Sequence, residues 1–157
     1  MGLLGFKEIK SRLERYCAFQ ERSPFEVNKK LASFTSDSKQ LDKIMASLIK
    51  EGFLNQERFV ESYMQGKINQ KRWGKEKIKA GLIQHKTPPN IIAKSLEQVN
   101  PERYKENLLF LAEKKHRGLA TGLSVYEKKV KVLRFLSSKG YTSDDWYDLD
   151  FDTLFAS

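Results

Sequence analysis

The sequence predicts an all-α protein, a tandem array of three three-helix repeats that forms an elongated, curved molecule. Apolar residues recur at spacings of three and four along most of the 157 residues, as on one face of a helix. No stretch alternates with period two for long enough to propose a strand. Pairs of apolar residues also recur at intervals of 51 and 54 residues: Val27 and Leu31, Ile78 and Leu82, Val132 and Leu136. Such a long period is typical of one supersecondary unit repeated in tandem.

The three repeats are expected at residues 1–52, 53–99 and 100–157. In the first repeat, an apolar stripe predicts a helix over residues 6–20. Ser23 and Glu26 flank Pro24 in a capping box, which starts a second helix that extends to Phe34. A third helix follows the polar residues 35–39 and ends at Gly52, a residue that tolerates the left-handed conformation common at helix ends.

The second repeat is predicted to begin with Asn55 as an N-cap. Gly74 is expected to open its middle helix, and Thr87 with Pro88 to cap the last one. In the third repeat, Asn100 and Pro101 start a helix that carries Tyr104 and Leu108.

A loop at residues 117–122 is then the best candidate for an internal hinge. Ser124 and Glu127 predict a further capping box, and the helix after it is expected to bury Tyr126 and Leu136 and to end at Gly140. A short ninth helix is predicted around Trp146 and Leu149, followed by a frayed acidic tail.

The charge distribution is uneven. The chain has 29 Lys and Arg against 20 Asp and Glu, a formal net charge of +9. Residues 65–86 hold seven of these basic residues and one acid, whereas residues 140–157 hold five Asp and no basic residue. A positive surface attracts nucleic acid, an anionic membrane or an acidic protein, and composition leaves all three open.

Little in the sequence suggests catalysis. His85 and His116 have no partner at metal-ligand spacing, no glycine-rich phosphate loop is present, and the acidic tail lacks the pattern of a calcium loop. The single cysteine, Cys17, lies on an apolar helix face and is expected to be a buried, inert thiol. We therefore expect no catalytic residue, metal or cofactor.

Membrane association is not expected either. The first ten residues do not resemble a signal peptide, Phe6 stands where myristoylation needs Ser or Thr, and no run approaches 18 apolar residues. These features predict a cytoplasmic protein.

The basic window is the main candidate site. A groove lined by its residues would bind phosphates in a salt-dependent manner. From charge, we expect these contact residues: Lys67, Lys71, Arg72, Lys75, Lys77 and Lys79. Trp73 could stack on a base or fill the junction between two helices. A second set of basic residues could continue the same face or form an ordinary solvated face: Lys114, Lys115, Arg117, Lys128, Lys129, Lys131 and Arg134.

Residues 52–64, GFLNQERFVESYM, resemble the signature of the RecX family of RecA modulators. The glycine, two apolar residues and an Asn cap match, as do the following Arg58, Phe59 and Tyr63. Gly74, Ile78 and the stretch from residue 131 to 146 are similar to later parts of the family pattern. The departures are at turns, where Thr35-Ser36 and Lys86-Thr87 replace glycine followed by an apolar residue.

This resemblance implies a non-enzymatic regulator that binds RecA nucleoprotein filaments. Such a protein lies in the filament groove, hinders filament growth and promotes disassembly, and so acts on DNA repair, recombination and the SOS response. We expect a monomer whose partners are the RecA filament and single- or double-stranded DNA. The alternative is a DNA-binding helical module that acts without a recombinase partner.

Overall fold

A computed structural model describes residues 4–155, in which every regular element is helical. The helices are α1 (Phe6–Phe19), α2 (Pro24–Ala32), α3 (Ser38–Lys50), α4 (Gln56–Asn69), α5 (Lys75–Gln84), α6 (Pro89–Glu97), α7 (Pro101–Arg117), α8 (Val125–Ser138), α9 (Ser143–Trp146) and α10 (Phe151–Leu154). They form two compact units. Unit 1 contains residues 4–63 and 82–91, and unit 2 contains residues 64–81 and 92–155.

The prediction that the recurring apolar residues lie on the buried faces of their helices is confirmed. All six recurring apolar residues are completely buried: Val27, Leu31, Ile78, Leu82, Val132 and Leu136. The same position of the repeat therefore faces a core each time, as expected of tandem helical repeats.

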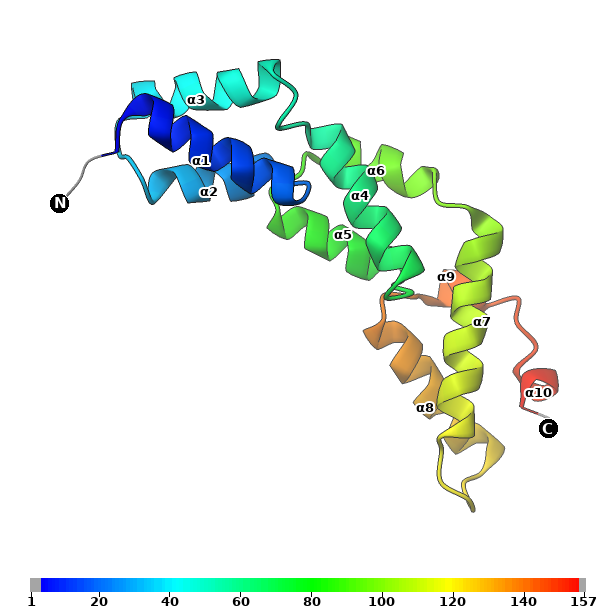
Figure 1. Ribbon diagram of the computed structural model, residues 1–157. Coiled ribbons are helices and arrows are strands. Elements are labelled where there is room, and N and C mark those ends of the chain that lie inside the picture. The colour runs from blue at the N-terminus through cyan, green and yellow to red at the C-terminus, as the bar shows by residue number, and fades with distance from the viewer. Residues whose placement is uncertain (1–3, 156–157) are drawn as a thin grey trace. The chain divides into compact units, whose positions relative to one another are not determined.

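In unit 1, α1, α2 and α3 pack against one another around an apolar core (Figure 1). Cys17 belongs to this core, and burial raises the pKa of its thiol, so the thiol is held in its unreactive neutral form. Two predicted N-caps are confirmed. The Ser23 hydroxyl accepts from the Glu26 amide at 3.1 Å, and the Asn55 side chain accepts from the Arg58 amide at 2.9 Å.

In unit 2, α7 and α8 run antiparallel to each other, side by side (Figure 1). Asn100 caps α7 by accepting from the Arg103 amide at 3.0 Å, and Ser124 caps α8 by accepting from the Glu127 amide at 3.1 Å. Both caps agree with the sequence. The loop between α7 and α8 lies where it was predicted.

Three details of the sequence prediction were wrong. α6 begins at Pro89, and the hydroxyl of Thr87 is buried with no hydrogen-bond partner within the described range, so it does not cap the helix. Tyr126 is 76% exposed, because Val132 and Leu136 define the buried face of α8 and Tyr126 lies off it.

The tail is also not frayed as far as residue 155. It forms α10, which Asp150 caps through the Thr153 amide at 3.2 Å. Phe151 is buried, and the Phe155 ring stacks on His116 at 4.2 Å between centroids. Aromatic residues thus anchor a segment that was predicted to fray.

Candidate functional site

The candidate site is built on the turn between α4 and α5, in unit 2. Arg72 adopts a left-handed conformation there, with φ of 54°. Its carbonyl accepts a hydrogen bond from the Tyr141 hydroxyl at 2.9 Å, and the Trp73 amide donates to the Lys67 carbonyl at 3.0 Å. These bonds hold the basic turn in one conformation.

Two glycines bring this turn against the end of α8. The Gly74 amide donates to the Lys139 carbonyl at 2.7 Å, and the Glu76 amide donates to the Gly140 carbonyl at 3.1 Å. A Cβ atom on Gly74 would lie 2.3 Å from the Gly140 carbonyl carbon. Only glycine permits this approach, which fixes the start of α5 against the third repeat.

Tyr104 of α7 completes the junction. Its hydroxyl accepts from the Lys75 amide at 2.9 Å and lies 3.2 Å from the Asp145 carboxylate, to which it donates. Burial raises the pKa of Tyr104, and the Asp145 carboxylate raises it further. The amides of residues 74, 75 and 76 all have protein acceptors, so these three groups do not serve to bind an anion at the start of α5.

A buried asparagine joins α7 to α4. The Asn107 side-chain amide donates to the Ile68 carbonyl at 3.0 Å, at the end of α4 where carbonyls lack helical partners. Sequence reasoning missed this contact. The one signal for it was a polar residue beside Leu108 and Leu111, within the apolar stripe of α7.

The six predicted contact residues fall into three groups. Lys67 and Lys77 lie together, with their Nζ atoms 4.5 and 4.7 Å from the centroid of the Trp73 ring. Arg72 lies over Phe110 at 3.7 Å, and Lys75 lies 5.1 Å from the Tyr104 ring.

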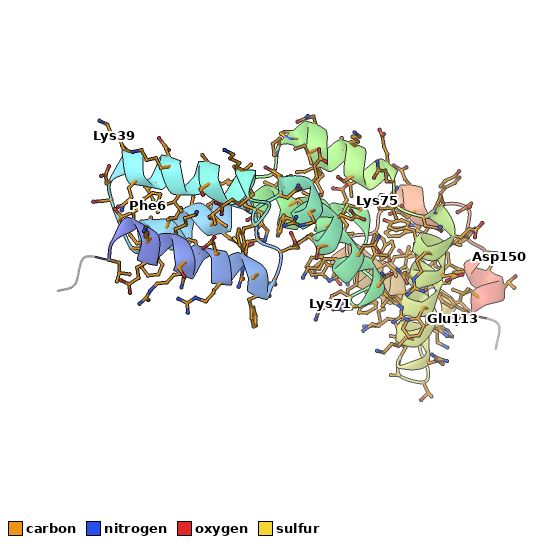
Figure 2. The ribbon with its side chains drawn as sticks, turned by 45° about the horizontal axis from the view of Figure 1, so that its top comes forward. Phe6, Lys39, Lys71, Lys75, Glu113 and Asp150 are labelled. Carbon is orange, nitrogen blue, oxygen red and sulfur yellow. The ribbon has the colours of Figure 1, made fainter. Side chains whose placement is uncertain are left out.

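The side chains of Lys71 and Lys79 are exposed to solvent. Figure 2 labels Lys71 and Lys75. Lys71 lies on the turn after α4, and Lys79 lies on α5. The structure therefore brings Lys67 and Lys77 together at one ring, directs Arg72 and Lys75 to rings of α7, and leaves Lys71 and Lys79 on the surface.

Only some residues of the second basic set lie near an aromatic ring. Lys115 of α7 and Lys139, just after α8, lie 5.4 and 5.5 Å from the Phe135 ring. Lys129 of α8 lies 5.5 Å from the ring of Phe151, the first residue of α10. Lys139 was not part of the predicted set, because it lies on the turn after α8 and not within either run of basic residues.

The two histidines have packing roles. His85 lies between Phe59 and Tyr63, at 4.9 and 5.6 Å between centroids, and its Nδ1 is 2.9 Å from the Ser23 hydroxyl. His116 stacks on Phe155. Within residues 4–155, no three His, Cys, Asp or Glu side chains are grouped to hold a metal ion. No helix in that same part of the chain is both long and apolar enough to cross a membrane.

The contact between Ser23 and His85 in unit 1 corresponds to the one between Gly74 and Lys139 in unit 2. Ser23 and Gly74 are 51 residues apart, and His85 and Lys139 are 54 apart, the same intervals as the apolar repeat. In both, the start of the middle helix of one repeat meets the turn before the last helix of the next repeat.

Two family models match the chain. The one described as RecX, second three-helix domain, matches residues 55–96, and the one described as RecX, third three-helix domain, matches residues 102–145. The chain is 30% identical over 139 residues to the regulatory protein RecX of Lactococcus lactis, and 34% identical over 124 residues to that of Clostridium tetani. These alignments cover 87% and 76% of this chain but 52% and 55% of the relatives, so it spans about half their length.

Solved structures share the fold. The crystal structure of RecX from Lactobacillus salivarius is similar with a TM-score of 0.81 at 24% identity, over 96% of this chain and 94% of that one. Another crystal structure of a regulatory protein RecX gives the same TM-score and identity, over 91% of this chain and 70% of the other.

The recurring junction and the basic surface define a tandem three-helix-repeat protein. The family models match two successive repeats of this kind, and the curated relatives extend the similarity over most of the chain. The chain belongs to the RecX family, whose matched curated members are named regulatory proteins.

Proposed function

We propose that this protein binds RecA nucleoprotein filaments and lowers recombinase activity, and thereby regulates DNA repair and recombination. Membership of the RecX family carries the proposal, since the matched relatives are named regulatory proteins. The proposed role needs a binding surface and no catalytic group.

The basic residues at the α4–α5 turn supply the proposed contact surface. A RecA filament presents acidic protein and DNA phosphate, and positive charge suits both. Lys71 and Lys79 are the simplest contacts, because both side chains are exposed to solvent. Lys67 and Lys77 are held at Trp73 and present an ordered pair of charges. Arg72 and Lys75 contribute from the rings of α7.

A DNA-binding module that acts without a recombinase is the second candidate. The excess of positive charge in unit 2 supports this candidate. Unit 2 contains 17 Lys and Arg and 11 Asp and Glu, and five of these acidic residues lie within residues 144–152. Such an excess favours any polyanion, so charge alone does not separate the two functions.

RecA-driven strand exchange separates them. The proposed function predicts inhibition by far less protein than is needed to coat the DNA, because one bound molecule blocks growth of a whole filament. Excess bare DNA is expected to leave this inhibition in place. If inhibition requires enough protein to coat all the DNA, and bare competitor DNA removes it, the DNA-binding module is the correct function. We also expect no ATP hydrolysis by the protein alone.

A further inference from the structure

The hairpin formed by α7 and α8 is longer than the equivalent hairpin formed by α4 and α5. α7 has 17 residues, whereas α4 has 14. The 54-residue interval places the equivalent of Lys75, where α5 begins, at Lys129, but α8 already begins at Val125. α8 therefore has about one extra helical turn at its start. This turn precedes the buried repeat positions Val132 and Leu136, so it lies outside the repeated core.

Apolar side chains are concentrated at this extension. We call residues 118–126, which join α7 to α8 and include the start of α8, the hairpin tip (Figure 1). Val125 and Tyr126 are 61% and 76% exposed, and Leu119 and Leu123 of the same loop are half-buried. Single exposed apolar side chains are ordinary on a protein surface, but a group of them marks an interaction site.

The hairpin tip is held in a defined conformation. At one end, the Gly118 and Leu119 amides donate to carbonyls of the last turn of α7, both at 3.1 Å. Gly122 has a φ of 88°, which glycine adopts without steric cost. At the other end, the Ser124 hydroxyl accepts from the Glu127 amide at 3.1 Å and lies 3.2 Å from the Glu127 carboxylate, to which it donates. An ordered backbone thus presents the exposed side chains, which lowers the entropic cost of binding.

The start of the middle helix is covered in the first two repeats and uncovered in the third. Ser23, which precedes α2, is buried and contacts His85. Gly74, which precedes α5, is buried against Gly140. Ser124, which precedes α8, is exposed, and within residues 4–155 its side chain makes hydrogen bonds only to its own helix. The hairpin tip is therefore a free surface in the described part of the chain.

Basic residues flank the apolar tip. Residues 113–131 contain two glutamates and six basic residues, which are Lys114, Lys115, Arg117, Lys128, Lys129 and Lys131. None of the six forms an ion pair with any residue from 4 to 155. An apolar centre with a basic rim is complementary to an apolar pocket with carboxylates at its edge.

The apolar centre favours a protein as the ligand. Leucine and valine side chains neither stack on bases nor pair with phosphates, whereas a protein pocket accommodates them together with a tyrosine, a residue enriched at the energetic centres of interfaces. A lipid surface suits the tip less well. Even a whole myristoyl chain gives only marginal, reversible membrane binding, and the tip exposes two large apolar side chains, Val125 and Tyr126.

We propose that the hairpin tip docks in an apolar, acid-rimmed pocket on a recombinase subunit of the filament, with Val125 and Tyr126 as its anchors. This inference rests on the proposed function and assigns its protein contact to a second surface of unit 2. The tip binds protein through apolar area, whereas the basic turn between α4 and α5 acts through charge.

The variant Val125→Ser/Tyr126→Ser tests the tip in two binding measurements, one with RecA filaments on single-stranded DNA and one with the same DNA without RecA. Filament affinity should fall by about tenfold or more, because the two anchors are removed from the centre of the contact. Affinity for bare DNA and its salt dependence should match those of the wild type, because no charge changes. Ile49→Ser/Tyr147→Ser is the matched control, since it also removes an exposed aliphatic side chain and an exposed tyrosine, and it should bind both ligands as the wild type does.

Photocrosslinking identifies what the tip contacts. p-Benzoylphenylalanine introduced at position 126 should crosslink to RecA within the filament, whereas a crosslink to DNA would overturn the proposal. Wild-type filament affinity in Val125→Ser/Tyr126→Ser would overturn it too. Binding of the wild type, but not of this variant, to phosphatidylglycerol vesicles would assign the tip to a lipid surface and would also contradict the proposal.

The proposed function and the tip contact fail in different ways. If the wild type binds the filament no more tightly than bare DNA, the proposed function is wrong and the tip contact with it. If the wild type prefers the filament and Val125→Ser/Tyr126→Ser binds it equally well, only the tip contact is wrong. The urea midpoint of the variant should equal that of the wild type, because both side chains are exposed, so a loss of binding would not reflect unfolding.

Discussion

Gly74 and Gly140 belong to successive three-helix domains, and their backbones meet with no side chain between them. A Cβ atom at Gly74 would lie 2.3 Å from the Gly140 carbonyl carbon, and one at Gly140 would lie 2.5 Å from the Lys77 Cβ. The Gly140 φ of 99° also requires glycine. This contact positions the basic turn, so the stability of unit 2 and the geometry of the candidate site depend on the same two residues.

Gly74→Ala is therefore expected to lower the free energy of unfolding by about 1–3 kcal/mol, the usual cost of forcing extra volume into a packed site. Urea denaturation followed by circular dichroism measures the loss. Gly66→Ala is the control, because Gly66 lies inside α4 and a Cβ atom there would meet no neighbouring side chain or element within 4 Å. That substitution should be neutral or stabilise by up to about 1 kcal/mol. Equal stability of the two variants would show that the close glycine contact is absent in solution.

Lys86 occupies the position equivalent to Gly140, 54 residues earlier, and has a φ of 59°. Left-handed backbone costs a residue with a side chain about 1–2 kcal/mol. Lys86→Gly should relieve that cost, offset by about 0.4–1 kcal/mol of added entropy in the unfolded chain. We expect a net gain of up to about 1 kcal/mol in the free energy of unfolding, and no gain from Lys86→Ala. A less stable Lys86→Gly protein would contradict the assignment of this turn.

The hydroxyl of Tyr104 predicts a pH dependence. Burial, and then the Asp145 carboxylate, raise the pKa of Tyr104 in the folded protein above the value of about 10 expected when the chain is unfolded. The unfolded state thus releases this proton first as pH rises. The stability that neutral Tyr104 contributes is complete below pH 10 and is lost as pH rises from there toward the folded pKa, with a slope of up to about 1.4 kcal/mol per pH unit.

Tyr104→Phe should flatten this alkaline loss and should cost about 1–3 kcal/mol at pH 7, because the Lys75 amide and Asp145 lose their buried partner. Denaturant titrations at pH 7 and above pH 10 measure both effects. Tyr147→Phe is the control, since Tyr147 is 80% exposed. An unchanged alkaline slope in Tyr104→Phe would show that Tyr104 does not hold its proton more tightly in the folded state.

Local signals in the sequence predicted most of the helices. Ser23, Asn55, Asn100 and Ser124 were identified as N-caps because a cap needs only one polar side chain at the right distance from a run of apolar residues. The buried faces followed from periodicity. The tail was missed because α10 is only four residues long, and its order depends on aromatic contacts with residues distant in sequence.

The candidate site was less predictable. Charge identified Lys67 and Lys77, but it gave no sign that both lie on Trp73. Lys139 was not predicted as a contact residue, because it becomes part of the site only through the contact of Gly74 with Gly140, 66 residues apart in the chain. A pattern within one repeat does not reveal which turns of two repeats meet.

Reversal of charge at Lys71 and Lys79 tests the proposed filament contact with little structural disturbance, because both side chains are exposed. Lys71→Glu/Lys79→Glu should reduce inhibition of strand exchange at least tenfold, and the loss should shrink at high salt as screening increases. Lys39→Glu/Lys43→Glu changes the net charge equally on α3 and should retain inhibition. Equal loss in the two variants would indicate a response to net charge and not to this surface.

The most direct test of the central claim compares binding to RecA filaments on single-stranded DNA with binding to the same DNA without RecA. Both affinities are measured at physiological salt, where non-specific binding to DNA phosphates is weak. The proposed function predicts that the protein binds the filament at least tenfold more tightly. Equal affinity for the two, or tighter binding to bare DNA, would contradict it.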